Sequence, residues 1–191
     1  MTDTRAVLYV IVCGAGPASR IGTLVSLAQD DGWDVCPIAT PSAVHHFLDI
    51  PALETLTGHR VRSDYRTADD EPLPRADAIV VAPATYNTIN KWAAGISDTY
   101  ALNMLAELTG LGVPIVVLPF VNTALAANRA FTRGVDELRA AGITVLHGPE
   151  GFQPHPPRTG SSVLDRYPWH LALDAIRQHH PSPPSNPRTS T

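Results

Sequence analysis

Long apolar runs, clustered basic residues and a signal sequence are all lacking in this chain of 191 residues. No apolar run reaches the roughly 18–20 residues that a membrane-spanning helix requires, so we expect no membrane insertion. The N-terminal residues lack the charged region, apolar region and cleavage site of a signal peptide, which favours a cytoplasmic protein. The formal net charge is −4 and the lysines and arginines are scattered. Nucleic acid is therefore not an expected partner, because its phosphates select for clustered positive charge.

Cysteine is also scarce, since Cys13 and Cys36 are the only two in the sequence. Two cysteines provide neither a disulfide framework nor a recognisable cluster of metal ligands, so we expect no metal site. Both fall in strand-like runs, where cysteine behaves as a small buried hydrophobic residue. The apolar fraction of 44% predicts a packed globule, and a chain of this length suffices for one domain with a substantial core.

Apolar runs alternate with segments of helical periodicity along the chain. The first run, residues 6–13, is continuous and rich in β-branched residues, as in a parallel strand that is covered on both faces. This alternation predicts right-handed βαβ connections and an α/β fold, a single doubly wound Rossmann-like domain with a parallel sheet. Strands are expected at 6–13, 35–39, 78–82, 113–118 and 143–146, and helical segments at 18–31, 41–56, 89–108, 123–141 and 169–178.

Two segments do not follow this alternation. Residues 148–167 are rich in proline and glycine and have little periodicity, which predicts a long loop that could act as a lid. Residues 181–191 have the composition of a disordered tail. The folded domain is therefore expected to comprise residues 1–180.

A glycine-rich turn, Gly14-Ala15-Gly16, follows the first strand and opens a helical segment. Glycine lets the backbone approach a phosphate closely, and the N-terminus of a helix offers free N–H groups. The dinucleotide-binding fingerprint needs a third glycine, where this sequence has Ser19, and an acidic residue after the second strand, which is absent. An NAD site is therefore disfavoured, and a tight turn without a ligand remains the alternative.

Two hydroxyl groups, those of Thr40 and Ser42, follow the second strand. They could donate hydrogen bonds to a phosphate, although serine and threonine also cap helices routinely. Pro41 between them suits the first turn of a helix and fits capping equally well.

Small and amide-bearing residues follow the third strand. A flat ring can lie against the backbone of small residues, while asparagine and threonine supply donors and acceptors for its polar edge. An ordinary N-capped helix after a strand would produce a similar pattern. The residues concerned are Ala84, Thr85, Asn87 and Thr88, with the run Gly95-Ile96-Ser97-Asp98 behind them.

The run Pro83-Ala84-Thr85-Tyr86-Asn87-Thr88 resembles the PASANT-type motif of the homo-oligomeric flavin-containing cysteine decarboxylases. That family includes phosphopantothenoylcysteine decarboxylase and the lantibiotic decarboxylases, which act on the C-terminal cysteine of a peptide. The resemblance covers roughly residues 7–146. Further matches in the same order are Gly32-Trp33-Asp34-Val35, Leu56-Thr57-Gly58 and Ala76-Asp77.

The resemblance implies a flavodoxin-like flavoprotein fold with FMN as the cofactor. It also implies a homo-oligomer, a trimer or dodecamer, because FMN sites in the family form at contacts between the subunits of a trimer. It places the phosphate near Gly14, Ala15, Gly16, Thr40 and Ser42, and the ring near Ala84, Thr85, Asn87 and Thr88.

The catalytic residues match less well. The family's histidine lies shortly before the Ala-Asp pair, where this sequence has Asp69 and Asp70. Either carboxylate could serve as a base if its pKa were raised, and a solvated surface charge is the alternative. Asn122 matches the family asparagine that binds the substrate carboxylate. His155, in the proline-rich segment, would reach the flavin if that segment closed as a lid, with an ordinary loop residue as the alternative.

The resemblance implies FMN-dependent oxidative decarboxylation of a peptide or small cysteine-containing substrate, with the C-terminal cysteine of a ribosomal peptide favoured. In the family, flavin takes two electrons from the cysteine side chain, and the resulting thioaldehyde loses CO2 to leave an enethiolate. The late Gly-Cys segment of phosphopantothenoylcysteine decarboxylase is absent, which argues against coenzyme A biosynthesis. The alternatives are a non-catalytic or regulatory FMN-binding subunit, which the lost histidine would suit, and a flavin prenyltransferase.

Overall fold

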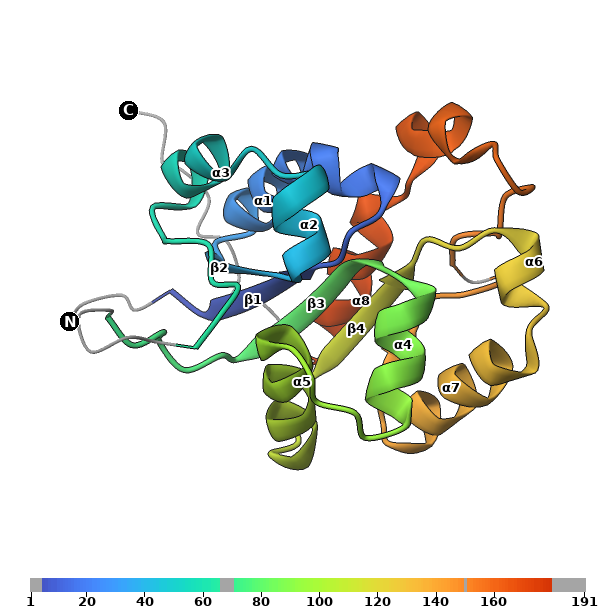
Figure 1. The fold of residues 1–191 in the computed structure, drawn as a ribbon. Coiled ribbons are helices and arrows are strands. Elements are labelled where there is room, and N and C mark those ends of the chain that lie inside the picture. Colours follow the sequence, from blue (N-terminus) through green and yellow to red (C-terminus); the bar gives the residue numbers. More distant parts are fainter. Residues whose placement is uncertain (1–4, 66–70, 150, 180–191) are drawn as a thin grey trace.

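The structure, a computed structural model, describes residues 5–65, 71–149 and 151–179 (Figure 1). These residues form a five-stranded parallel sheet in the order β2-β1-β3-β4-β5. The α/β fold, a doubly wound Rossmann-like domain with a parallel sheet, is therefore confirmed. The strands are β1 (Val7–Val12), β2 (Asp34–Ala39), β3 (Ala78–Ala84), β4 (Ile115–Pro119) and β5 (Thr144–Val145).

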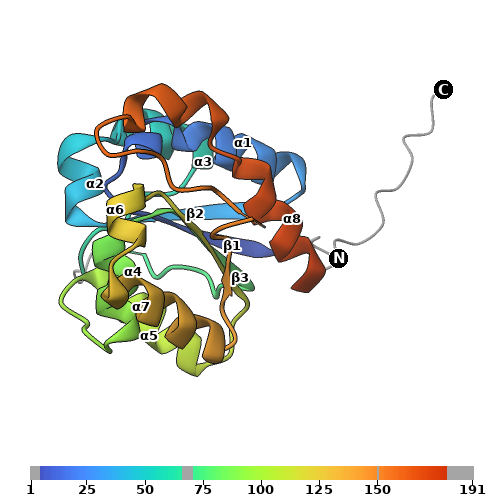
Figure 2. The same cartoon turned by 90° about the vertical axis from the view of Figure 1, so that its right-hand side faces the viewer.

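Helices cover both faces of the sheet (Figure 2). One face carries α1 (Ile21–Asp30), α2 (Pro41–His46), α3 (Ile50–Thr57) and α8 (Trp169–His179). The other carries α4 (Tyr86–Ala93), α5 (Tyr100–Gly110) and α7 (Arg129–Ala140), while α6 (Thr123–Ala126) lies at the end of the sheet, beyond β4. Within the described ranges, no helix is long and apolar enough to cross a membrane.

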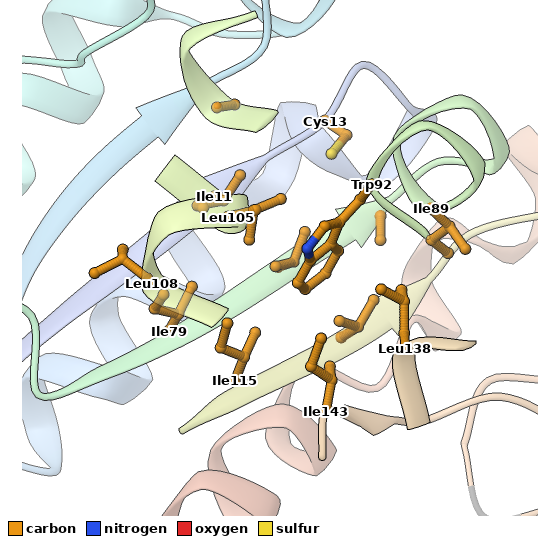
Figure 3. Packing of buried hydrophobic residues seen from close by; sticks show 14 of the residues in the cluster. Ile11, Cys13, Ile79, Ile89, Trp92, Leu105, Leu108, Ile115, Leu138 and Ile143 are labelled. Carbon is orange, nitrogen blue, oxygen red and sulfur yellow. The ribbon is translucent and has the colours of Figure 1, made fainter. Parts of the chain in front are cut away.

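Two apolar cores lie between the sheet and its helices, because successive strand residues point to opposite faces. In β1, Leu8 and Val10 face the layer of α1 and α8, whereas Ile11 faces the layer of α4, α5 and α7. The second layer buries Trp92 of α4 and Leu105 of α5 against the strands (Figure 3). Burial on both faces explains why the strands read as continuous apolar runs rather than alternating ones.

Capping residues divide the helical segments that periodicity predicted at 89–108 and 123–141. Gly95 ends the first helix with a φ of +70°, and the Thr99 side chain then caps α5 by accepting from the Leu102 amide. Asn128 caps α7 by accepting from the Ala130 amide at 2.9 Å. Gly142, expected after the last helical residue, has a φ of +84°, as that position requires.

The segment predicted as a long loop at 148–167 is more ordered than expected in its described residues. It contains a 3-10 helix, η2 (Gly160–Arg166), and Tyr167 after it is buried. The Tyr167 hydroxyl donates to the Leu118 carbonyl of β4 at 2.6 Å. The segment is thus packed onto the sheet, because its aromatic side chains supply an apolar contact that periodicity does not reveal. The tail predicted at 181–191 lies outside the described residues, so the domain limits of 1–180 stay a prediction.

Candidate functional site

A cavity of about 350 Å³ lies where the carboxyl ends of β1, β2 and β3 meet. The chain leaves β1 toward β2 on one side, and β3 lies on the other, so this is the point where the direction of winding reverses. Ligands of open α/β sheets bind at such points, and the volume is within the range of small-molecule sites. The lining residues are Gly14, Thr40, Pro41, Ser42, Thr85, Asn87, Thr88, Thr99 and Leu102.

Gly14 forms the closest-packed part of this cavity. A Cβ atom at this position would lie 2.4 Å from Ser42 Oγ and 2.8 Å from Ser42 Cβ, closer than real atoms approach. Without a side chain at Gly14, the turn after β1 lies directly against Ser42 at the start of α2. The Gly14 backbone and the Ser42 hydroxyl thus lie side by side in the cavity wall, an arrangement that suits a phosphate group.

Two threonine side chains at the strand ends carry the polar character of the cavity. Thr40 caps α2, with its hydroxyl accepting weakly from the Ala43 amide at 3.4 Å. Thr85 caps α4 in the same way, accepting from the Thr88 amide at 3.3 Å, and the hydroxyl oxygens of Thr85 and Thr88 are 3.0 Å apart. Capping uses the Thr40 and Thr85 oxygens as acceptors. The Thr40 hydroxyl hydrogen can therefore donate to a ligand, whereas the Thr85 and Thr88 hydroxyls also bond to each other and to Cys13. With apolar Leu102 opposite, the lining fits an anionic group joined to a flat apolar ring.

Cys13 lies beneath Thr85 and Thr88. The thiol is fully buried, and burial raises its pKa although both threonines hydrogen bond to it. It is therefore a neutral thiol at neutral pH and does not act as a nucleophile.

The structure brings together most of the residues predicted to bind the cofactor. Gly14, Thr40, Ser42, Thr85, Asn87 and Thr88 all line the cavity, whereas Ala15, Gly16 and Ala84 do not. Ala84 is fully buried in the core, and Gly16 faces the proline-rich segment, where its added Cβ would lie 2.8 Å from Leu164 Cδ2. Sequence reasoning missed Thr99 and Leu102, although the run Gly95-Ile96-Ser97-Asp98 leads directly into them.

The structure describes only some of the predicted catalytic residues. Asp69 and Asp70 lie outside the described residues. Asn122 is half-buried at the end of β4 and does not line the cavity; its Oδ1 accepts from the Leu125 amide at 2.9 Å as the cap of α6. His155 pairs with this segment through its backbone, because its carbonyl accepts from the Thr123 amide at 2.8 Å.

Known proteins show the family of this chain. The Flavoprotein family model matches residues 2–160. The chain belongs to the Flavoprotein family. This flavoprotein is 28% identical over 159 residues to the coenzyme A biosynthesis bifunctional protein CoaBC of Bacillus subtilis (strain 168), a match covering 80% of the chain. The chain spans only 38% of the length of that curated relative.

Solved structures share the flavoprotein's fold. The FMN-dependent cysteine decarboxylase TvaF from thioviridamide biosynthesis is 26% identical, with a TM-score of 0.65, and the similarity covers 90% of this chain and 98% of TvaF. The FMN-binding protein AtHal3 has a TM-score of 0.70 over 94% of this chain and 99% of its own, at 20% identity, which shows the fold alone. Family membership and the FMN-dependent neighbour together support FMN as the cofactor of this flavoprotein.

Proposed function

We propose that this chain binds FMN in the cavity at the strand ends and oxidatively decarboxylates a cysteine-containing substrate, with the C-terminal cysteine of a peptide preferred. The observation that carries the proposal is the convergence of the predicted phosphate-binding and ring-binding residues on one cavity. The similarity to TvaF along almost its whole length supports the reaction class. Bound FMN would accept two electrons from the cysteine side chain, a chemistry that belongs to the cofactor.

In this proposal the cofactor is held by hydroxyls and backbone rather than by charge. Gly14, Thr40 and Ser42 surround the phosphate end, beside the start of α2. Asn87 and Thr99 provide polar groups for the ring, and Leu102 provides an apolar surface.

Asn122 is proposed to orient the substrate carboxylate. Its Oδ1 is engaged as the cap of α6, so the amino group Nδ2 is the part that remains to donate. Donation to the carboxylate fixes the position of the group that leaves as CO2.

Asp69 or Asp70 is proposed as the base that removes a proton from the substrate, and one observation favours His155 as a second candidate. His155 Nδ1 lies 2.9 Å from the Pro156 carbonyl oxygen, a contact in which Nδ1 carries the hydrogen. In the neutral ring this leaves Nε2 free of a proton and able to accept one. His155 pairs with Asn122 through the backbone, so the segment that carries this acceptor lies beside the proposed carboxylate-binding residue.

We also propose a homo-oligomer, a trimer or dodecamer, because the family resemblance places FMN at contacts between subunits. The second candidate function is a non-catalytic or regulatory FMN-binding subunit, which the absence of the family histidine favours.

The test begins with the visible spectrum of the purified protein and reconstitution with FMN, followed by incubation with peptides that end in cysteine. We expect mass spectrometry to show the loss of one CO2 and two hydrogens from the peptide. Asn122→Asp keeps the helix cap, removes the amide donor and places a negative charge beside the carboxylate. It should therefore abolish turnover while FMN stays bound, whereas Asn128→Asp, the same change at the cap of α7, should leave turnover intact.

Base assignment is tested by Asp69→Asn, Asp70→Asn and His155→Gln, each assayed for turnover across pH with FMN content measured in the same sample. Loss of turnover in one variant, with FMN retained, identifies the base. An FMN-loaded protein that converts no cysteine-terminated peptide contradicts the decarboxylase proposal and favours the regulatory subunit. A protein that cannot be loaded with FMN contradicts both.

A further inference from the structure

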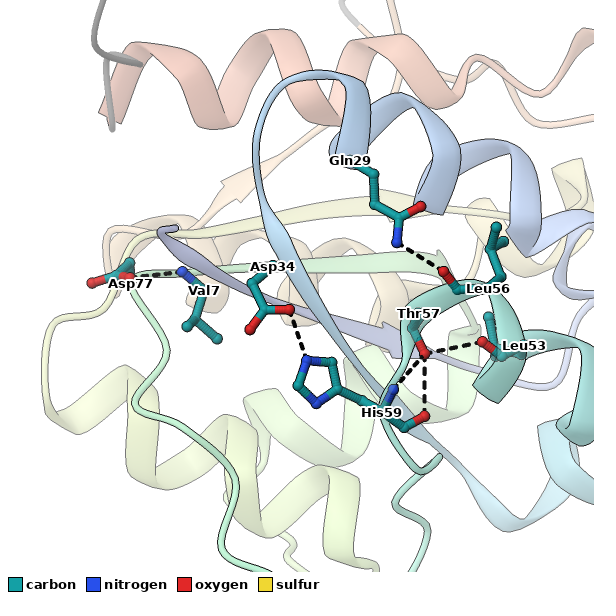
Figure 4. Close-up of polar contacts among 8 residues, drawn as sticks. All are labelled: Val7, Gln29, Asp34, Leu53, Leu56, Thr57, His59 and Asp77. Atoms are coloured by element: carbon teal, nitrogen blue, oxygen red, sulfur yellow. Dashed lines mark hydrogen bonds and ion pairs between the residues drawn. The ribbon is translucent and has the colours of Figure 1, made fainter. Parts of the chain in front are cut away.

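Three side chains of different ligand chemistry gather at the amino end of β2. Asp34 and Cys36 are alternate residues of the strand and therefore point to the same face. His59, from the turn after α3, brings its ring to them, and His59 Nε2 lies 2.7 Å from Asp34 Oδ1 (Figure 4). The three candidate ligand atoms all lie within 4.8 Å of one another.

Hydrogen bonds in the turn after α3 hold His59 in this position. The buried Thr57 hydroxyl lies 3.0 Å from the Leu53 carbonyl oxygen and accepts from the His59 amide at 3.2 Å (Figure 4). Gly58 between them has a φ of +74°, a conformation that side chains disfavour. Further on, Arg62 pairs by its backbone with β2, donating to the Pro37 carbonyl at 3.1 Å. Fixed backbone on both sides gives His59 little freedom to move away.

The combination of donors selects among metal ions. A carboxylate oxygen, an imidazole nitrogen and a thiolate sulfur together suit zinc and similar divalent transition metals, whereas calcium and magnesium prefer oxygen alone. Zinc bonds of about 2.0–2.3 Å in tetrahedral geometry space the ligand atoms roughly 3.3–3.6 Å apart. Small side-chain rotations would produce this spacing. The distance between His59 Nε2 and Asp34 Oδ1 would increase from 2.7 Å, and the longer distances between ligand atoms, up to 4.8 Å, would decrease.

We propose that Asp34, Cys36 and His59 form a binding site for a divalent transition metal ion of the zinc class. The side chains of Asp34 and His59 are 35% and 29% exposed, so an ion can reach them from solvent, and buried Cys36 forms the floor. A cavity of about 210 Å³ opens at His59, and its lining also includes Arg60, Arg62 and Glu71. Three protein ligands leave a fourth position for water or another group.

The site is separate from the cofactor cavity. Asp34 begins β2 and Thr40 follows its end, so the strand places them roughly 20 Å apart at opposite edges of the sheet. Metal binding therefore does not depend on the proposed decarboxylation, and each can fail without the other.

The experiment uses the full chain after treatment with a chelator, with FMN content measured in each sample. Zinc is titrated by calorimetry, and cobalt(II) is titrated as a spectroscopic substitute, recorded as difference spectra. We expect one ion per chain, with a cobalt–thiolate charge-transfer band and the visible bands of a tetrahedral ion. Cys36→Ser should remove the thiolate band, and His59→Gln should weaken zinc binding at least tenfold.

Cys13→Ser, which removes the other buried cysteine, and His46→Gln, which removes an exposed histidine, are the matched controls and should leave binding unchanged. Circular dichroism establishes that each variant is folded. If Cys36→Ser fails to fold, the thiolate band of the unmodified chain and its loss in His59→Gln carry the test. Absence of one-to-one binding, a spectrum without the thiolate band, or equal zinc affinity in folded Cys36→Ser or His59→Gln would overturn the proposal.

Discussion

Replacing Gly14 by alanine adds one methyl group where the cofactor cavity is narrowest. The new Cβ would lie 2.4 Å from Ser42 Oγ, 2.8 Å from Ser42 Cβ and 3.0 Å from the Ser42 carbonyl carbon. Gly14 is not among the glycines with positive φ, so alanine is compatible with the backbone and the effect is steric. Two of the Ser42 atoms, Cβ and the carbonyl carbon, move only with the backbone, so we expect the exposed first turn of α2 to shift at Ser42 into the cavity.

The steric cost then makes the free energy of ligand binding less favourable, since a bound ligand must return Ser42 to the position where it clashes with the new methyl group. Overpacking by a methyl group costs about 1–3 kcal/mol. At 1.4 kcal/mol per tenfold change, this corresponds to an FMN dissociation constant raised roughly 5- to 150-fold. Fluorescence titration of the FMN-free protein with FMN measures this constant, and thermal unfolding of the same protein measures the part of the clash that the free protein retains.

Two further variants make this prediction specific. Gly22→Ala in α1 is the matched control, because its Cβ would make an ordinary 3.6 Å contact with Leu56 Cδ2 of α3. It should leave FMN affinity unchanged and stabilise the helix by about 0.5–1 kcal/mol. Ser42→Gly removes both side-chain atoms of the clash, so combining it with Gly14→Ala should recover part of the affinity lost. An unchanged FMN affinity in Gly14→Ala would refute the placement of the cofactor in this cavity.

Three other predictions concern stability. Tyr167→Phe removes the hydrogen bond to the buried Leu118 carbonyl and should lower the free energy of unfolding by about 1–3 kcal/mol in urea titrations; an unchanged midpoint would contradict this role. Leu105→Ala, a fully buried site, should cost about 2–5 kcal/mol, whereas Leu111→Ala, 69% exposed, should change stability by less than about 0.5 kcal/mol. Burial lowers the pKa of His147 in the folded state, so the unfolded chain binds the proton more readily and stability should fall as pH drops below the ordinary histidine pKa. His147→Gln should flatten this pH dependence, and an unaltered slope would exclude His147 as its source.

The parallel sheet could be predicted because its strands are short, apolar and buried on both faces, so each strand appears in the sequence as a continuous run. Helix boundaries were less predictable, since hydrophobic periodicity continues across a cap. Asn128 interrupts a segment whose periodicity predicts one helix, because its side chain accepts a hydrogen bond from the Ala130 amide and caps a new helix. The 148–167 segment was harder still, since the packing of Tyr167 on β4 is a contact between residues distant in sequence.

The sequence by itself determined which residues stand at the carboxyl ends of the strands, because parallel strands bring the residues that follow them to one edge. Gly14, Thr40 and Thr85 were identified in that way. Only the tertiary structure decided which of their neighbours enclose the cavity, placing Leu102 in it and Ala84 in the core. Likewise, Asp34 and His59 meet because the chain returns along β2 after α3, a long-range approach that residue spacing does not encode.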